Sequence, residues 1–344
     1  MNSSIIQILY VPQYEGVNPY MQINMEIIGS LENVELVKLP TLKEVVRRPL
    51  KFILGRPYDL VILNWLEHWL EKDGALSALG VTRFVARLLF MRLAGVRLVY
   101  VRHNIFPHGL KGKRAAVSKW LIDMAERVCD ARVAHSGHMK DDGYHYIPHP
   151  IFPVDASGCT TDAKTKQYYI IFGRIVRYKN IERVIEQWGS EASGKTLMVV
   201  GAAIDRGYAR ELVALSQGRA VDINPTFVSE PEAQVLVQKA RGLIIAHAEA
   251  DVIVSASFFF AISNGTPVYA VETPFLAWAK NDLKLPGLSV FPDVVSLVAG
   301  LAHGGRTDLN RNDIRQRAEA EFGTEVTREA WGRLLRKLGL PLEK

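Results

Sequence analysis

The 344-residue sequence contains only two cysteines, Cys129 and Cys159. Two thiols are too few for the disulfide framework of a small secreted domain or for a zinc site built from cysteines. We therefore expect a buried thiol and a linker thiol without a redox role. No histidine pair has the H-E-x-x-H spacing of a zinc protease, so metal binding is not expected.

Long apolar runs are missing as well. The apolar stretch Val252–Ile262 is interrupted by Ser255 and Ser257. It is too short for a bilayer, which needs ~20 consecutive apolar residues. The N-terminus has no basic region before its short apolar stretch, so it predicts a first buried strand and not a signal peptide. These features favour a cytoplasmic protein.

Two common nucleotide-binding signatures are absent. Neither half of the chain shows G-x-G-x-x-G after its first strand, and no Walker A sequence occurs, which argues against a dinucleotide dehydrogenase and a P-loop NTPase. The formal charge of +6 nevertheless suggests an anionic partner: nucleic acid, anionic lipid or a phosphorylated small molecule. The clustered aromatic and basic motif of nucleic-acid recognition modules is missing, so we expect no nucleic-acid partner.

Strand-like and helix-like segments alternate in both halves, which predicts parallel sheets covered by helices on both faces. The length exceeds the roughly 250–300 residues at which one core stops growing, so two domains are expected. The polar segment 153–167 lacks periodicity and is typical of a linker. We predict Rossmann-like domains over 1–152 and 168–322, and a C-terminal helix over 323–344 that packs back on the first domain.

The ends of two predicted strands in the second domain predict an anion site. Ligands of parallel sheets bind at the carboxyl ends of strands and at helix N-termini. In IIFGRIVRYKN, Gly173 permits close approach of a ligand, and Arg174 and Lys179 are placed to flank a diphosphate. A helix is expected to begin near Ser255, and its entrance, Asp251–Ala256, would offer unpaired amides to phosphate. The alternatives are a solvated basic loop and an ordinary buried helix.

Polar residues that follow strands of the first domain are candidates for catalysis. Glu15 lies in the loop after the first strand, and His103 directly follows the strand VRLVYVR. Either residue is a candidate general base. The alternatives are an exposed loop acid and a structural histidine. Further candidates for acceptor contacts are Trp65, Glu67, Asn104 and His108, although core packing also explains the tryptophan.

Three segments, 47–52, 82–97 and 111–120, mix basic and apolar residues. They predict either a cationic, partly apolar surface that faces anionic lipid, or amphipathic helices that cover the sheet with their basic residues in water. The sequence leaves both interpretations open.

The chain resembles the GT-B nucleotide-sugar glycosyltransferases over almost its whole length. The strand–GRIVRYKN–helix segment resembles their diphosphate-contacting G-R-x-x-x-x-K. FVSEPEAQVLVQKA resembles the following segment, which implies donor contacts at Val228, whose backbone would meet the nucleotide base, and at Glu232. The resemblance implies an α/β fold of GT-B architecture, with two Rossmann-like parallel-sheet domains facing a cleft. The first domain would bind the acceptor and the second the nucleotide sugar.

A closer similarity is to the bacterial exopolysaccharide group that includes the xanthan β-mannosyltransferase. It rests on N-P-Y, here Asn18-Pro19-Tyr20, on ILNWLE, and on H-N-x-x-P-H, here His103–His108. It also rests on a C-terminal signature of a polar residue, then S-G, then L-S-x-x-x-P-V, here Asp251, Ser255-Ala256 and Ile262–Val268. In that signature Ala256 replaces the usual glycine. The similarity implies acceptor contacts at Asn18 and Tyr20.

The large retaining families place two glutamates eight residues apart before G-T-P-V, where this chain has Val252 and Phe260. Asp251 or Glu249 is the nearest substitute for the missing carboxylate. The departure implies an inverting displacement that needs neither a metal nor another cofactor. A base would deprotonate the acceptor hydroxyl while cations and a helix N-terminus stabilise the departing nucleoside diphosphate.

The resemblance implies transfer of a hexose, favouring mannose from GDP-mannose, to a lipid-linked oligosaccharide at the inner face of the plasma membrane. The pathway would be exopolysaccharide or surface-glycan biosynthesis. A UDP-hexose donor is an open alternative. A catalytically silent nucleotide-sugar-binding module of a polysaccharide assembly complex is another. A nucleotide-sugar epimerase is less favoured, because the carboxylate pair that it would need is not found.

Overall fold

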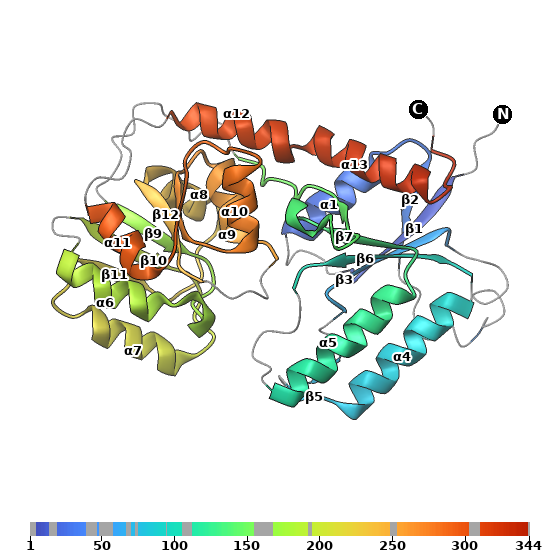
Figure 1. Cartoon of the computed structure of the whole chain (residues 1–344), viewed down its shortest axis with the longest axis horizontal. Helices are drawn as coiled ribbons and strands as arrows, with labels where there is room; N and C mark the ends of the chain where they lie inside the picture. The colour runs from blue at the N-terminus through green and yellow to red at the C-terminus, as the bar shows by residue number, and fades with distance from the viewer. Residues whose placement is uncertain are drawn as a thin grey trace. The chain divides into compact units, whose positions relative to one another are not determined.

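The computed structural model divides into two compact units (Figure 1). Unit 1 comprises Met1–Pro150, Asp251–Val254 and Thr324–Lys344, and unit 2 comprises Ile151–Ala250 and Ser255–Gly323. The structure describes residues 5–13, 19–38, 47, 58–66, 70–72, 75–93, 95–104, 112–154, 168–191, 195–247, 253–302 and 310–342. Each unit contains one six-stranded sheet in which every paired strand is parallel to its neighbour. The predicted α/β class is confirmed.

The sheet of unit 1 has the strand order β2-β1-β3-β6-β7-β8. Its strands are β1 Ile6–Val11, β2 Val34–Val37, β3 Leu60–Asn64, β6 Arg97–Arg102, β7 Ala131–Ala134 and β8 His145–Tyr146. Every residue of β3 is buried, as expected for a central parallel strand covered on both faces. A two-stranded antiparallel hairpin, β4 Glu71–Lys72 and β5 Ala75–Leu76, lies outside this sheet.

Helices cover both faces of this sheet. One core cluster contains side chains of α1 Pro19–Gly29 and α13 Thr324–Lys337, and another contains side chains of α4 Ala78–Leu93 and α5 Gly112–Arg127. Trp331 of α13 is fully buried, and its Nε1 donates to Oδ1 of Asn24 in α1 at 2.9 Å. The C-terminal helix therefore completes the core of unit 1.

The sheet of unit 2 has the order β11-β10-β9-β12-β13-β14. Its strands are β9 Tyr168–Phe172, β10 Thr196–Val200, β11 Val221–Asn224, β12 Gly242–Ile245, β13 Val268–Val271 and β14 Leu288–Phe291. This is the doubly wound order 3-2-1-4-5-6, in which the winding reverses between β9 and β12. Open parallel sheets bind their ligands beyond the carboxyl ends of the strands at such a reversal.

Two sets of helices flank this second sheet. Helices α6 Ile181–Glu191, α7 Arg206–Ser216 and α11 Val294–Ala302 share one core cluster with the strands. The other helices of the unit are α8 Glu230–Lys239, α9 Ala256–Ser263, α10 Pro274–Asn281 and α12 Arg311–Phe322. Phe259 of α9 contacts the rings of Phe275 in α10 and Phe322 in α12. The rings thus join three helices into one layer.

Strand β11 ends at Asn224, whose side-chain Oδ1 accepts from the amide of Thr226 at 3.2 Å. One domain boundary differs from the sequence-based expectation. Residues Asp251–Val254 were expected inside the second domain but belong to unit 1, where Ile253 packs with Ala134, Met139 and Tyr144. No helix among the described residues is both long and apolar enough to cross a membrane.

Candidate functional site

The carboxyl end of β9 is shaped for close approach of a ligand. Gly173 follows the strand with φ 98°, a conformation that residues with a side chain rarely adopt. A Cβ at this position would lie 3.1 Å from Lys179 Nζ and 3.4 Å from Ser257 Oγ. The backbone conformation therefore favours glycine, and a side chain here would also crowd the ammonium of Lys179.

Lys179 and Ser257 converge on one carbonyl at this strand end. Lys179 Nζ donates to the carbonyl oxygen of Phe172 at 3.2 Å, and Ser257 Oγ donates to the same atom at 3.0 Å. Burial, and secondly the charge of Arg174, lower the pKa of the Lys179 ammonium to about 8. Within the described residues Lys179 has no carboxylate partner. An anion placed here would find a poorly solvated cation.

The loop that carries Lys179 is held by neighbouring elements. The 3₁₀ turn η4 Arg177–Lys179 ends at Asn180, whose Nδ2 donates to the carbonyl of Ala246 just beyond β12. Arg177 pairs instead with Glu211 of α7, at 2.8 Å. Arg174 is exposed. The cations of the predicted basic loop are thus divided, with Lys179 held at the strand end and Arg177 engaged by α7.

The N-terminus of α9 lies at the same place, because Ser257 is its second residue. Ser255 is the N-cap residue, and its side chain makes no capping hydrogen bond. Its carbonyl accepts from the amides of Phe258 and Phe259. The amides of Ala256 and Ser257 have no backbone acceptor in the described part of the chain, and Ala256 is exposed. Such amides, with the helix dipole, favour an anion.

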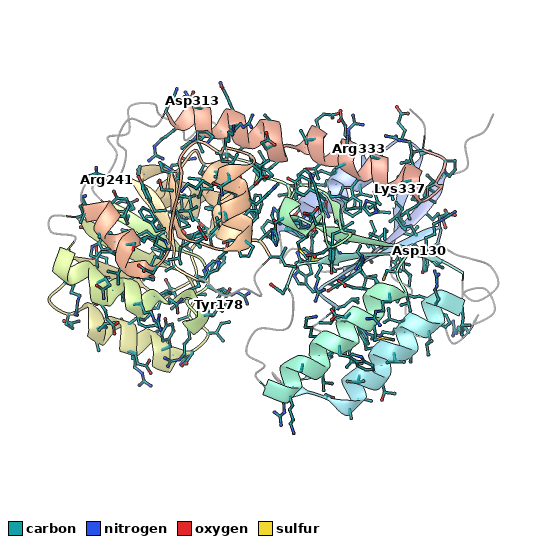
Figure 2. The ribbon with its side chains drawn as sticks, in the orientation of Figure 1. Asp130, Tyr178, Arg241, Asp313, Arg333 and Lys337 are labelled. Atoms are coloured by element: carbon teal, nitrogen blue, oxygen red, sulfur yellow. The ribbon has the colours of Figure 1, made fainter. Side chains whose placement is uncertain are left out.

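His247 is a candidate that the sequence interpretation missed. It follows β12 by two residues, on the other side of the β9/β12 reversal, and is buried. Its ring meets that of Tyr178, labelled in Figure 2, edge-on at 6.0 Å. The apolar pattern of LIIAHA predicts a strand that includes His247, so the histidine was not recognised as a residue that follows the strand. The signal that would have found it is a polar residue placed just after an apolar run of strand length.

The predicted contacts beyond β11 have local structural roles. Glu232 Oε2 accepts from the backbone amide of Ser229 at 3.0 Å and from its hydroxyl at 2.7 Å, so it caps α8. These bonds lower the pKa of Glu232. Val228 is half-buried and the neighbouring Phe227 is 81% exposed. Their contact with a donor stays a prediction.

In unit 1 the corresponding reversal of winding lies between β1 and β3, and His103 lies near it. His103 follows β6 and is buried. Its ring stacks on that of Trp65 at 4.3 Å, with 16° between the planes. Trp65 directly follows β3 with φ 48°, a left-handed conformation that costs about 1–2 kcal/mol for a residue with a side chain. This backbone conformation places the indole against the imidazole.

Asn64 orients the His103 ring. Its Nδ2 donates to the carbonyl of Val11 at 3.2 Å, which leaves Oδ1 as the atom 3.0 Å from His103 Nε2. An amide oxygen only accepts, so Nε2 carries a proton in this bond. In the neutral ring the basic lone pair is then on Nδ1.

Tyr20 belongs to a buried polar cluster. Its hydroxyl lies 2.6 Å from His135 Nε2 and accepts from Asn24 Nδ2 at 3.2 Å. His135 Nδ1 bonds the carbonyl of Ile147, so Tyr20 donates to Nε2. Burial lowers the pKa of His135 to about 4 and that of His149 well below its ordinary value, so both stay neutral at pH 7. Tyr20 is only 4% exposed, and its contact with an acceptor stays a prediction.

Five predicted site residues, Glu15, Asn18, Glu67, His108 and Asp251, lie outside the described residues. Asn104 is described and is half-buried, with its carbonyl accepting from Arg102 Nε at 3.2 Å. In the described ranges no group of three or more His, Cys, Asp or Glu side chains is placed to hold a metal. The absence of a metal requirement stays a prediction.

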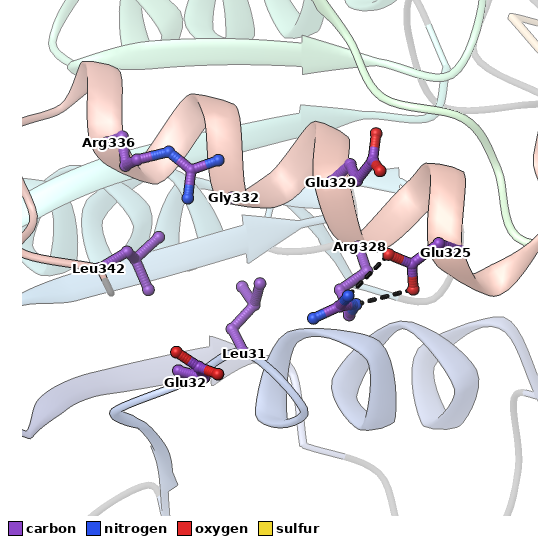
Figure 3. Close-up of a pocket in the computed structure, with 8 residues that line it drawn as sticks. All are labelled: Leu31, Glu32, Glu325, Arg328, Glu329, Gly332, Arg336 and Leu342. Atoms are coloured by element: carbon purple, nitrogen blue, oxygen red, sulfur yellow. Dashed lines mark hydrogen bonds and ion pairs between the residues drawn. The ribbon is translucent and has the colours of Figure 1, made fainter. Parts of the chain in front are cut away.

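A pocket of about 260 Å³ opens elsewhere on unit 1, between α13 and the turn before β2 (Figure 3). It is lined by Leu31, Glu32, Glu325, Arg328, Glu329, Gly332, Arg336 and Leu342. Leu31 and Glu32 precede β2, so the pocket lies at the amino edge of the sheet, whereas His103 follows a strand. Arg328 is already paired with Glu325 at 2.6 Å. We assign this pocket no part in the candidate site.

The sequence matches no protein-family profile and no curated protein. Its fold is shared by solved structures. HepE of Anabaena, in complex with UDP, matches with TM-score 0.66 and 13% identity over 96% of this chain and 99% of HepE. A glycosyltransferase from Rickettsia africae matches with TM-score 0.65 and 10% identity, over 99% of this chain and 100% of the matched chain. A glycosyltransferase involved in avilamycin A biosynthesis matches with TM-score 0.57 and 14% identity, over 97% of this chain and 98% of the matched chain.

The chain has the GT-B fold. This confirms the predicted architecture, while the closer similarity to the xanthan group stays a prediction. In this GT-B chain Phe260 stands where the resemblance placed the second glutamate of the retaining families. Its ring stacks on Phe172 at 4.9 Å and meets Phe152 edge-on at 5.7 Å. An aromatic cluster therefore replaces a carboxylate beside the end of β9.

Proposed function

We propose that this protein is a nucleotide-sugar glycosyltransferase in which unit 2 binds the donor and unit 1 the acceptor. The observation that carries the proposal is the meeting of Gly173, Lys179 and the α9 N-terminus at the β9/β12 reversal. A glycine, a poorly solvated cation and two amides that have no backbone acceptor among the described residues suit a diphosphate at this strand end. The shared fold of glycosyltransferases, together with that of HepE bound to UDP, supports the same interpretation.

In the proposed reaction, the acceptor oxygen forms a bond with C1 of the sugar while the bond from C1 to the diphosphate oxygen breaks. The bonding electron pair leaves with the nucleoside diphosphate. Lys179, Arg174 and the amides of Ala256 and Ser257 stabilise this developing negative charge. The acceptor proton passes to a general base. We propose that the displacement inverts the anomeric centre and needs no metal.

His103 and Glu15 are the two candidates for the base. For His103, the bond to Asn64 leaves the neutral ring with Nδ1 as its basic atom, and stacking on Trp65 limits rotation of the ring. Glu15 lies outside the described residues. We propose Trp65 and Asn104 as acceptor contacts, with Tyr20 packed edge-on against the Trp65 ring.

We propose two donors for comparison. GDP-mannose follows from the resemblance to the xanthan group, and a UDP-hexose is favoured by the complexes of HepE with UDP and with UDP-glucose. The acceptor in this proposal is a lipid-linked oligosaccharide of exopolysaccharide or surface-glycan synthesis. The enzyme would then work at the cytoplasmic face of the plasma membrane.

A catalytically silent nucleotide-sugar-binding module is the second candidate. It is favoured by one observation, the aromatic ring of Phe260 in place of a carboxylate. Such a module would bind the nucleotide sugar with the same residues of unit 2. It would neither transfer the sugar to an acceptor nor hydrolyse the donor.

The test is calorimetric titration with GDP, UDP, GDP-mannose and UDP-glucose, with and without EDTA, followed by assay of donor turnover. We expect one nucleotide to bind selectively and independently of chelator, and Lys179→Met to weaken it by about 10-fold or more. Lys280→Met, an exposed lysine on α10, is the matched control. Binding without turnover would favour the silent module. If none of the four compounds binds, the donor-site assignment is wrong.

A further inference from the structure

Exposed apolar side chains gather on two helices of unit 1. Nine of the fifteen large hydrophobic side chains that are exposed in the described part of the chain lie on α4, on α5 or directly after α5. Trp120 is 60% exposed, Leu89 58% and Leu93 78%. The nine are Leu79, Val85, Leu89, Phe90, Leu93, Val117, Trp120, Met124 and Val128. We call them, with the basic residues exposed between them, the α4–α5 outer face.

Helical spacing places these residues opposite the core. Phe84 and Leu88 of α4, and Leu121 and Ile122 of α5, are buried in the same core cluster on one face of the sheet. In Figure 1 the two helices lie side by side along that sheet. Positions 117, 120, 124 and 128 follow one another at steps of three or four, which is one stripe of a helix. Each helix thus carries a second apolar stripe that the described part of unit 1 leaves exposed.

The outer face is cationic because its helices carry more basic than acidic residues. Helix α4 contains three arginines and no acid, and α5 contains four basic and two acidic residues. Glu126 is buried and bonds Arg102 of β6 at 3.1 Å, whereas Asp123 is shared between Arg102 at 3.3 Å and Lys119 at 2.5 Å. Arg92 pairs with Asp130 at 3.1 Å, so two cations of the face already have acidic partners. The basic residues are exposed: Arg83, Arg87, Arg92, Lys113, Arg114, Lys119 and Arg127. The α4–α5 outer face therefore presents apolar side chains with exposed basic residues between them.

We propose that the α4–α5 outer face docks on an anionic lipid bilayer. Trp120, Leu89 and Leu93 would enter the boundary between headgroups and acyl chains, while arginines and lysines of both helices bind lipid phosphates. A tryptophan among aliphatic side chains suits this boundary, since its ring is apolar and its N–H is polar. The exposed apolar side chains are spread over two helices, so the surface suits a broad partner.

A second copy of the chain is a poorer occupant. A two-fold dimer would place this face against itself. The arginines of α4 would then meet arginines or lysines of the partner, and like charges brought together oppose association. A lipid surface offers the opposite charge. The inference rests on the proposed function only in the identity of the acceptor, since docking itself requires no nucleotide sugar.

The test is sedimentation with vesicles of phosphatidylcholine, alone or mixed with phosphatidylglycerol. We expect binding to the anionic vesicles about 10-fold tighter, or more, than to the neutral ones. Leu89→Glu/Trp120→Glu should weaken it about 10-fold or more. The matched control is Val213→Glu/Val295→Glu, which places the same two charges on exposed positions of α7 and α11. The control should bind the anionic vesicles as tightly as the unsubstituted protein.

Two further measurements separate the outcomes. Brominated lipids should quench fluorescence in the unsubstituted protein and quench much less in Trp120→Phe, which identifies the inserted ring. Nucleotide titration of Leu89→Glu/Trp120→Glu reports folding and tests the donor site independently. Equal binding to both vesicle types, or an unchanged double variant, would overturn the proposal. So would a dimer in sedimentation equilibrium that the same double variant dissociates.

Discussion

His103 Nε2 lies 3.0 Å from Asn64 Oδ1, and the amide of Asn64 is itself fixed by the carbonyl of Val11. The chain segments that meet here come from β1, β3 and the end of β6, which are neighbours in the sheet. If His103 is the base, Asn64 is a positioning residue that selects which ring nitrogen is basic.

Asn64→Leu should lower kcat by about 100-fold, because the ring of His103 loses the acceptor that orients it. KM for the nucleotide sugar should change little, since the donor residues belong to unit 2. Asn64→Asp keeps an acceptor at this position and should restore part of the activity. Its carboxylate also stabilises the imidazolium, so the acid limb of the pH–rate profile should move to higher pH. Steady-state kinetics across the neutral pH range measures both effects. Unchanged kcat in Asn64→Leu would point to Glu15 as the base.

Lys179→Met should weaken nucleotide binding without lowering the stability of the unliganded protein. The folded-state pKa of Lys179 is about 8, below the ordinary value of 10.5. The charged ammonium is therefore unfavourable in the fold below pH 8, and this penalty is relieved as pH rises from 8 to 10.5. Removing the ammonium should raise Tm at pH 7 by about 2–4 °C, as expected for a gain of roughly 1 kcal/mol in the free energy of unfolding. Differential scanning calorimetry of Lys179→Met and of the control Lys280→Met at pH 7 measures the change in Tm. A fall in Tm would mean that the ammonium stabilises the fold.

Nucleotide affinity should fall as pH rises above about 8. A bound diphosphate favours the protonated ammonium of Lys179 and raises its pKa, so the complex forms with uptake of a proton near pH 8. The dissociation constant should rise by up to about 10-fold per pH unit until the pKa of the complex is reached. Titrations in buffers of different ionisation enthalpy measure the proton uptake. Lys179→Arg, whose guanidinium stays charged, should lose this pH dependence. If the nucleotide affinity of Lys179→Arg still falls above pH 8, another titrating group is responsible.

Gly173→Ala should harm both stability and binding. The positive φ would cost about 1–2 kcal/mol in a residue with a side chain. The new Cβ would also press on Lys179 Nζ at 3.1 Å. Gly218→Ala is the matched control, because Gly218 has φ 73° and the methyl group of an alanine there would meet nothing within 4 Å. Denaturant unfolding should show similar backbone losses in both variants, whereas only Gly173→Ala should weaken nucleotide binding, by about 10-fold. Equal affinities would argue against a ligand at this strand end.

Trp331→Phe should destabilise unit 1 by about 1–3 kcal/mol. The substitution removes the Nε1 donor that bonds Asn24 at 2.9 Å in a fully buried site, and an unsatisfied buried acceptor carries a penalty of that size. Trp120→Phe, at a 60% exposed position, should change stability by less than about 0.5 kcal/mol. Chemical denaturation of the two variants compares them. Similar losses would show that the hydrogen bond to Asn24 contributes little.

Local patterns in the sequence were sufficient to predict the class of fold and the place of the candidate donor site. Apolar runs of strand length alternate with helical periodicity, and that alternation specifies parallel sheets. Gly173 and Ser255 were predicted from local rules, one for close approach of a ligand at a glycine after a strand and one for a helix start, and such rules involve only neighbours in the chain. The GT-B architecture was implied by the family resemblance, and the shared fold confirms it.

Only the tertiary structure could bring Lys179 and Ser257 to the carbonyl of Phe172 and join Asn64 to His103. Only it could show that Glu126 is buried against Arg102. These contacts join residues that are separated in the chain by between 7 and 85 positions. They depend on strand order and helix packing, which sequence periodicity does not encode. The sequence by itself determined which segments are strands and helices; the packing of those segments decided which polar groups share a site and which apolar side chains remain uncovered, because burial is a property of the assembled layers.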